Sequence, residues 1–152
     1  MSVLKTVKNP GEKKALFDFT NGINTDRWLY RQEIKVQKEW VKSLAQIDIL
    51  SESEAQKIEL CLDEALQLIE QNKFQWRIED EDIHMNLERF VTENLGELGK
   101  KMHLGRSRND LIATTLRLFI RDSIYEIHSS LTHLINILAV KAKDTATIIV
   151  PG

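Results

Sequence analysis

Residues 109–144 read NDLIATTLRLFIRDSIYEIHSSLTHLINILAVKAKD and contain neither proline nor glycine. Their apolar side chains recur at steps of three and four residues, a spacing that predicts an α-helix. The residues that carry this period are Ala113, Leu116, Ile120, Ile124, Ile127, Leu131, Leu134 and Leu138. With a rise of about 1.5 Å per residue, the helix would be on the order of 50 Å long. Because Leu118, Phe119 and Ile135 make a second side apolar, we expect this helix to pack in a bundle.

The residues before this segment also predict helices. Ser51 is followed three residues later by Glu54, the pattern of a capping box that opens a helix. The expected helices span residues 26–47, 51–69 and 80–95, with a loop over residues 71–79. Residues 1 to about 20 are expected to be irregular, with a turn at Pro10 and Gly11.

The fold class predicted from these patterns is all-α. The chain has only two prolines and six glycines, and runs that alternate apolar and polar residues are scarce.

Composition narrows the class of protein. The 152 residues are 42% hydrophobic and 29% charged, which is ordinary for a soluble globular chain. The net charge of −2 gives no basic surface for nucleic acid. No apolar run approaches the length that spans a bilayer, and the residues after Met1 do not resemble a signal peptide. These features predict a cytoplasmic protein without nucleic-acid or membrane partners.

Metal and cofactor sites are not expected. Cys61 is the only cysteine, so neither an internal disulfide nor a cysteine zinc site is indicated. Asp80, Glu81 and Asp82 form an acidic run, but no ligand partners accompany it. Acidic residues also suit the positive end of a helix, and we interpret this run as a solvated helix start.

Residues 103–110, HLGRSRND, lie where the long helix should begin, and they contain the candidate binding residues. An arginine fork and a carboxamide at a helix N-terminus form a suitable site for a carboxylate. Ser107 and Asp110 have the spacing of a second capping box. Two simpler interpretations remain open: Arg108 could pair with an acidic residue at a helix start, and Asn109 could only cap the helix.

The same octapeptide closely resembles the His-Thr-Gly-Arg-Ser-Arg-Asn-Asp signature of the argininosuccinate lyases. Other segments resemble that family in the same order and extend the resemblance over about residues 16–152. They are Asp26-Arg27 near the start, EDEDIH at 79–84, LRLFIR at 116–121 and IVPG at 149–152.

This resemblance implies a small-molecule substrate and an elimination reaction. Argininosuccinate would give arginine and fumarate, a step of arginine biosynthesis, through a doubly charged intermediate that fixed hydrogen-bond donors stabilise. Arg108 and Asn109 match substrate-binding positions of the family, and Ser107 adds a donor. His84 is a further candidate neighbour of the active site. The family also implies a homotetramer in which three subunits build each site.

The family's catalytic segments are absent from these 152 residues. Neither the Thr-His-Leu-Gln segment with the catalytic His nor the Gly-Ser-Ser-x-Met-Pro loop with the catalytic Ser occurs. The chain would therefore be the N-terminal portion of such an enzyme, would hold no catalytic residue and would be inactive in isolation. The resemblance implies that residues 1–108 form a small helical N-terminal domain and that residues 109–152 begin a central helix-bundle domain with its first long helix. The alternative is a non-catalytic, truncated relative that acts as a helical structural or interaction protein.

Three positions depart from the family pattern. Leu104 replaces the Thr of the signature, Leu111 replaces the Gln after Asn-Asp, and Gly22 stands where the family has a substrate-contacting Ser. The first two changes make the edge of the expected pocket more apolar, and the third removes a hydroxyl. A change of substrate specificity is the expected consequence.

Overall fold

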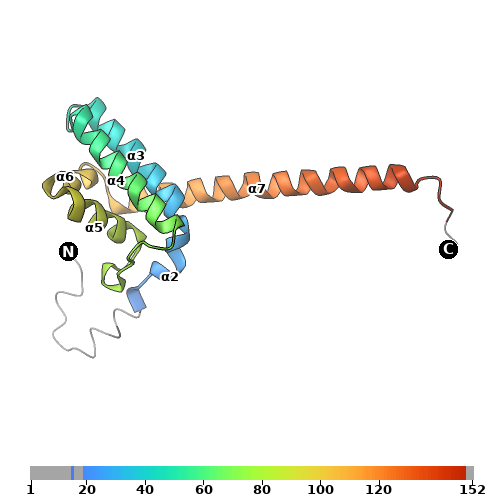
Figure 1. Cartoon of the computed structure of the whole chain (residues 1–152), viewed down its shortest axis with the longest axis horizontal. Helices are drawn as coiled ribbons and strands as arrows, with labels where there is room; N and C mark the ends of the chain where they lie inside the picture. Colours follow the sequence, from blue (N-terminus) through green and yellow to red (C-terminus); the bar gives the residue numbers. More distant parts are fainter. Residues whose placement is uncertain (1–14, 16–18, 150–152) are drawn as a thin grey trace. The chain divides into compact units, whose positions relative to one another are not determined.

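The structure, a computed structural model, describes Ala15 and residues 19–149. The turn expected at Pro10 and Gly11, and the end of the chain from Val150 on, lie outside the described residues. The described part contains helices and no strand, so the all-α prediction is confirmed (Figure 1).

The helices follow one another through short connections. In chain order they are α2 (Ile23–Asp26), η2 (Arg27–Leu29), α3 (Tyr30–Gln46), α4 (Glu52–Glu70), η3 (Ile78–Asp80), α5 (Ile83–Leu95), α6 (Glu97–Lys100), η4 (Lys101–His103) and α7 (Arg108–Thr145). The uninterrupted run at 109–144 thus forms one helix, within one residue of the predicted bounds at each end.

The start of α4 shows the capping box that the sequence predicts. The hydroxyl of Ser51 accepts a hydrogen bond from the backbone N–H of Glu54 at 3.2 Å. In return, Oε2 of Glu54 accepts from the backbone N–H of Ser51 at 2.8 Å. Two backbone donors at the helix start are therefore satisfied, and α4 begins where this local pattern places it.

Two other helices begin later than expected. The helix expected from residue 26 begins as α3 at Tyr30, because Arg27–Leu29 form the 3-10 helix η2 directly after α2, which ends at Asp26. The carboxylate of Asp26 accepts from the backbone N–H of Ile83 at 3.3 Å. The helix expected from residue 80 begins as α5 at Ile83. Glu81 has a φ of 61° and turns the chain, and Asp82 then caps α5 by accepting from the N–H of Met85 at 2.8 Å.

The hydrophobic core is built mainly by α3, α4 and α5. α4 packs against both α3 and α5, and Figure 1 shows α3 and α4 side by side. The side chains in the core that solvent does not reach at all are Val41, Ile58, Leu62, Ala65, Ile83, Leu87 and Val91. They recur at helical spacing, so one face of each helix is buried.

The chain divides into two compact units, one ending at Leu116 and the other beginning at Arg117, within α7. The domain boundary predicted after residue 108 remains a prediction. In the second unit the apolar side chains of α7 are exposed; among them are Ile120, Ile124, Ile127, Leu131, Leu134, Ile135 and Leu138. Within the described ranges, no helix is both long enough and apolar enough to cross a membrane.

Candidate functional site

The segment that leads into α7 is fixed by Trp40. Its indole N–H donates to the backbone carbonyl of Leu104 at 3.1 Å. Gly105 follows with a φ of 70°, a conformation that favours glycine, and a Cβ there would lie 3.7 Å from the Trp40 ring. This turn brings the chain from η4 to the first residue of α7.

Ser107 and Asp110 hold the start of α7 in a variant of the expected box. Oδ2 of Asp110 accepts from the backbone N–H of Ser107 at 3.2 Å. The Ser107 hydroxyl accepts from the N–H of Asn109, also at 3.2 Å, rather than from Asp110. The carboxamide of Asn109 is exposed and makes no hydrogen bond to a described residue.

Arg108 is held by an acidic residue, as its simpler interpretation proposed. Its Nη2 donates to Oδ1 of Asp82 at 2.6 Å, the same oxygen that caps α5. Its Nε is buried and has no partner within the part of the chain that the structure describes. Arg108 also lines a pocket of about 600 Å³ together with Met85, Glu88 and His103. The guanidinium is thus oriented by Asp82 while part of its donor set remains free.

His84 lies in the interior beside Glu33. Its Nδ1 is 2.9 Å from Oε2 of Glu33, an ion-pair distance, although the contact does not meet hydrogen-bond geometry. Burial lowers the pKa of His84, but the carboxylate of Glu33 outweighs this, and the net result is a raised pKa. Charged His84 is therefore favoured more than in water.

The carboxylate of Glu33 gathers polar groups from three helices. It accepts from the Thr115 hydroxyl of α7 at 2.7 Å and from the Gln37 amide at 2.8 Å, besides facing His84 of α5. Gln37 in turn accepts from Nη2 of Arg106 at 2.6 Å. The first turn of α5, Thr115 about two turns into α7 and the signature segment (residues 103–110) are thereby tied to one buried carboxylate on α3.

Sequence reasoning did not identify Glu33 and Gln37. A signal was present, since Glu33, Gln37 and Val41 follow at steps of four and so lie on the buried stripe of α3. A charged residue on such a stripe needs a polar or oppositely charged partner, because an unpaired buried charge is costly. The sequence pattern does not say which residue that partner is.

Arg106 is a further, partly buried cation in this region. Its guanidinium lies 5.6 Å from the centroid of the Trp40 ring. Burial lowers the pKa of Arg106, and its Nε and Nη1 are buried without a hydrogen bond to any described residue. Arg106 thus packs within the signature segment and fixes its shape.

Gly22 and Asp26 lie next to the start of α5. The N–H of Gly22 donates to the carbonyl of Glu81 at 2.8 Å, and a Cβ on Gly22 would lie 3.3 Å from Oδ2 of Asp26. Burial raises the pKa of Asp26 to about 6; the hydrogen bond from Ile83 opposes this rise and the charge of Asp82 adds to it. Gly22, one of the three departures from the family pattern, therefore lies beside Asp26. The charge of Asp26 is coupled to that of Asp82, which binds Arg108.

Metal ligands do not gather in this region. Across Ala15 and residues 19–149, no group of three or more His, Cys, Asp or Glu side chains is arranged to hold a metal ion. The signature segment does contain the hydrogen-bond donors of Arg106, Arg108 and Asn109, and such donors suit an anionic ligand.

Comparison with known proteins gives consistent matches. The sequence model of a family described as "Lyase" matches residues 11–152. The argininosuccinate lyase of Geobacter sulfurreducens is 42% identical over 135 residues, which cover 89% of this chain and 30% of the relative. That of Heliobacterium mobile is 38% identical over 142 residues, 93% of this chain and 31% of the relative. The chain thus spans about 30% of the length of these relatives.

Proposed function

The chain belongs to this lyase family, and we propose that it is the N-terminal part of an argininosuccinate lyase-like enzyme. The complete enzyme would eliminate fumarate from argininosuccinate to give arginine, in the cytoplasm and without a cofactor. The chain itself would supply a carboxylate-binding portion of the active site.

One observation above all supports this proposal. Nη2 of Arg108 is held by Asp82, while the side chain as a whole is 35% exposed and lines the pocket of about 600 Å³. A planar guanidinium that is oriented at one nitrogen and free at another is prepared to bind a carboxylate. The succinyl part of the substrate, and the fumarate that it becomes, both carry this group.

The start of α7 adds to the same preference. Asn109 offers its carboxamide there, and Ser107 lies directly before the helix. The N-terminus of a helix carries partial positive charge and unsatisfied N–H groups, which favour an anion. Ser107, Arg108 and Asn109 are accordingly the proposed substrate-binding residues.

His84 receives a different role in this proposal. Its side chain is 6% exposed and faces Glu33, which leaves little of it for direct contact with a ligand. We place it as a neighbour of the site that keeps the first turn of α5, and with it Asp82, in position. Gly22, Leu104 and Leu111 would adjust which substrate is accepted.

Catalysis would need segments that these residues do not include. The proton transfer assigned to the Thr-His-Leu-Gln and Gly-Ser-Ser-x-Met-Pro segments has no counterpart in this sequence. We therefore expect no fumarate from purified chain and argininosuccinate. Partners in the complete enzyme would be further copies of the chain, packed along the apolar sides of α7.

Binding of fumarate to the purified chain tests the proposal. NMR titration should shift the side-chain amide resonances of Asn109 and the Nε resonance of Arg108, with saturation in the millimolar range. Arg108→Lys keeps the charge but lacks the fork, so it should weaken binding about tenfold. Arg117→Lys is the matched control on an exposed arginine of the same helix.

Two results would count against a carboxylate site. One is the absence of any saturable shift with fumarate, and the other is equal binding by Arg108→Lys and the wild type. Either would favour the alternative, in which the chain is a non-catalytic structural or interaction protein.

A further inference from the structure

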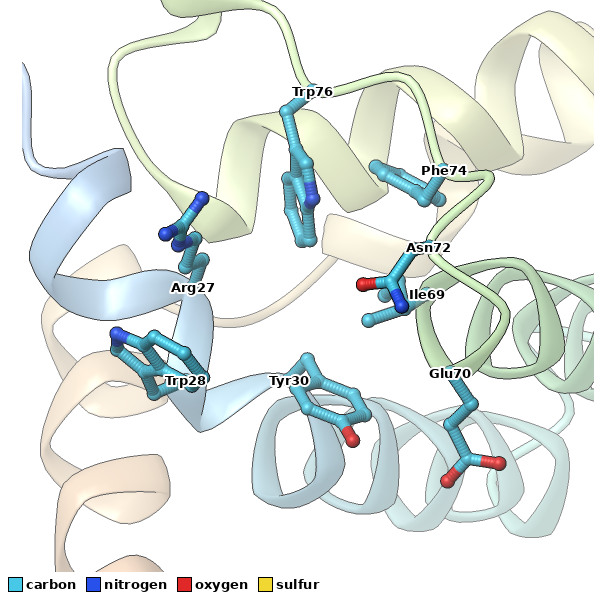
Figure 2. Close-up of a pocket in the computed structure, with 8 residues that line it drawn as sticks. All are labelled: Arg27, Trp28, Tyr30, Ile69, Glu70, Asn72, Phe74 and Trp76. Carbon is cyan, nitrogen blue, oxygen red and sulfur yellow. The ribbon is translucent and has the colours of Figure 1, made fainter.

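A second pocket lies between the start of α3 and the end of α4, and no predicted substrate residue lines it. Its volume is about 350 Å³. The lining residues are Arg27, Trp28, Tyr30, Ile69, Glu70, Asn72, Phe74 and Trp76. Figure 2 shows the rings of Trp28, Tyr30 and Trp76 around the hollow, with Arg27 between the two tryptophans.

The walls of this pocket are mainly aromatic. Phe74 and Trp76 pack with their ring centroids 4.5 Å apart, and Phe74 is anchored in the core. Trp28 instead remains 65% exposed, which is unusual for so large an apolar surface. Flat rings on several sides of a hollow provide stacking surfaces for a planar group.

The polar groups at this pocket are mostly donors. Glu70 is the acidic residue of the lining, and its Oε1 already pairs with Nη2 of Arg31 at 2.7 Å. The guanidinium of Arg27 lies 5.2 Å from the Trp28 ring centroid and has no carboxylate partner among the described residues. The indole N–H groups of Trp28 and Trp76 are likewise without an acceptor in the described ranges. The free donors of Arg27, Trp28 and Trp76 therefore favour a ligand with an anionic oxygen.

We propose that this pocket binds a small aromatic carboxylate. The flat ring would lie among Trp28, Tyr30 and Trp76, and the carboxylate would accept a bidentate pair of hydrogen bonds from Arg27. A cation is the less favoured ligand, because the guanidinium groups of Arg27 and Arg31 already lie over one face each of Trp28 and Tyr30 and make the surroundings positive. This inference does not depend on the proposed lyase function.

Benzoate is the probe for the test, and the three indole N–H resonances are the readout. Trp28 and Trp76 line the pocket, whereas the N–H of Trp40 donates to Leu104 outside it. Benzoate should shift the first two resonances saturably, with a Kd on the order of 1 mM for so small a ligand. The Trp40 resonance should stay in place. Trp→Phe variants assign the three signals.

Variants and related probes separate the contribution of the carboxylate to binding from that of the ring. Arg27→Gln should weaken benzoate binding about tenfold, whereas Arg117→Gln, which removes the same charge from outside the pocket, should leave it unchanged. Arg27→Lys should retain part of the affinity, because it keeps the charge and loses the fork. Benzyl alcohol, with the ring and no carboxylate, should bind more weakly than benzoate.

Three outcomes would overturn the proposal. The first is that benzoate leaves the Trp28 and Trp76 resonances unmoved. The second is that benzylamine binds with the same affinity as benzoate, and the third is that Arg27→Gln binds benzoate with the affinity of the wild type. The first would show that the hollow does not take this ligand, and the others that no anion site exists there. None of them bears on fumarate binding at Arg108.

Discussion

The carboxylate of Glu33 and the imidazole of His84 lie 2.9 Å apart, with exposed side-chain fractions of 0% and 6%. A charge pair so deeply buried is maintained only when other polar groups satisfy it. Thr115 and Gln37 supply those groups, and they bring α7 and α3 to the same point. The pair therefore connects the helices that present Asp82 and Arg108.

Replacing Glu33 by Gln should destabilise the fold. His84 would then lose its buried counter-charge, and breaking such a pair typically costs about 3 kcal/mol. Urea unfolding should show this loss, and NMR titration should show a lower pKa for His84. Glu39→Gln, which removes an exposed partner of Lys42, is the control and should change stability little. Equal effects of the two variants would show that the buried pair contributes no more than a surface pair.

Asp26 should make the folded state less stable as the pH rises from about 4 to 6. Its pKa is raised from 3.8 to about 6 by burial, with the charge of Asp82 adding to the rise and that of His84 opposing it. The folded state thus binds more protons than the unfolded chain in this window, so this stabilisation is complete below 3.8 and lost by about 6. Urea unfolding of the wild type and Asp26→Asn across this range measures it.

The informative quantity is the difference in unfolding free energy between wild type and Asp26→Asn. It should decrease as the pH rises through the window and become constant above it. A difference that does not change with pH would mean that the Asp26 carboxyl titrates at the same pH in the folded and unfolded chain.

A serine at position 22 should lower the pKa of Asp26. Oδ1 of Asp26 is buried without a partner in the described part of the chain, and a Cβ on Gly22 would lie 3.3 Å from Oδ2. A hydroxyl added there can donate to the carboxylate and favour its ionised form. Carboxyl NMR titration of Gly22→Ser should therefore give a pKa below 6.

Gly22→Ala is the matched variant, since it adds the same Cβ without a donor. The backbone of Gly22, with a φ of −95° and a ψ of −10°, accommodates either side chain. Equal pKa values in the two variants would exclude the hydrogen bond. The serine variant also restores the hydroxyl that the argininosuccinate lyase pattern places at this position, so its effect on fumarate binding can be measured in the same samples.

The elements that the sequence predicted correctly depend on short-range signals. Ser51 and Glu54 are three residues apart, and the long helix follows from a period of three and four residues. The role of Glu33 depends on Thr115, 82 residues further along the chain, and no local pattern contains that pairing. The hydrogen bond from Ile83 to Asp26 likewise joins residues that are 57 positions apart, so it too lies outside any local pattern.

The exposed apolar side chains of α7 predict self-association of the purified chain. Leu131, Leu134 and Leu138 recur along the helix and are each about half exposed. Full burial of a leucine contributes about 2 kcal/mol, so covering the exposed half contributes about 1 kcal/mol, and the many such side chains along α7 together offset the cost of joining two chains. We expect sedimentation equilibrium to show oligomers at micromolar concentrations.

Charge placed on this apolar surface should abolish that association. In the double variant Leu131→Glu and Leu138→Glu, each new carboxylate would have to leave water for an apolar contact, which is costly. The control is Ser129→Glu with Asn136→Glu, which adds the same charge at polar positions of the same helix. The control should associate as the wild type does. A monomeric wild type, or a control that dissociates like the leucine variant, would show that these leucines do not form the contact between chains.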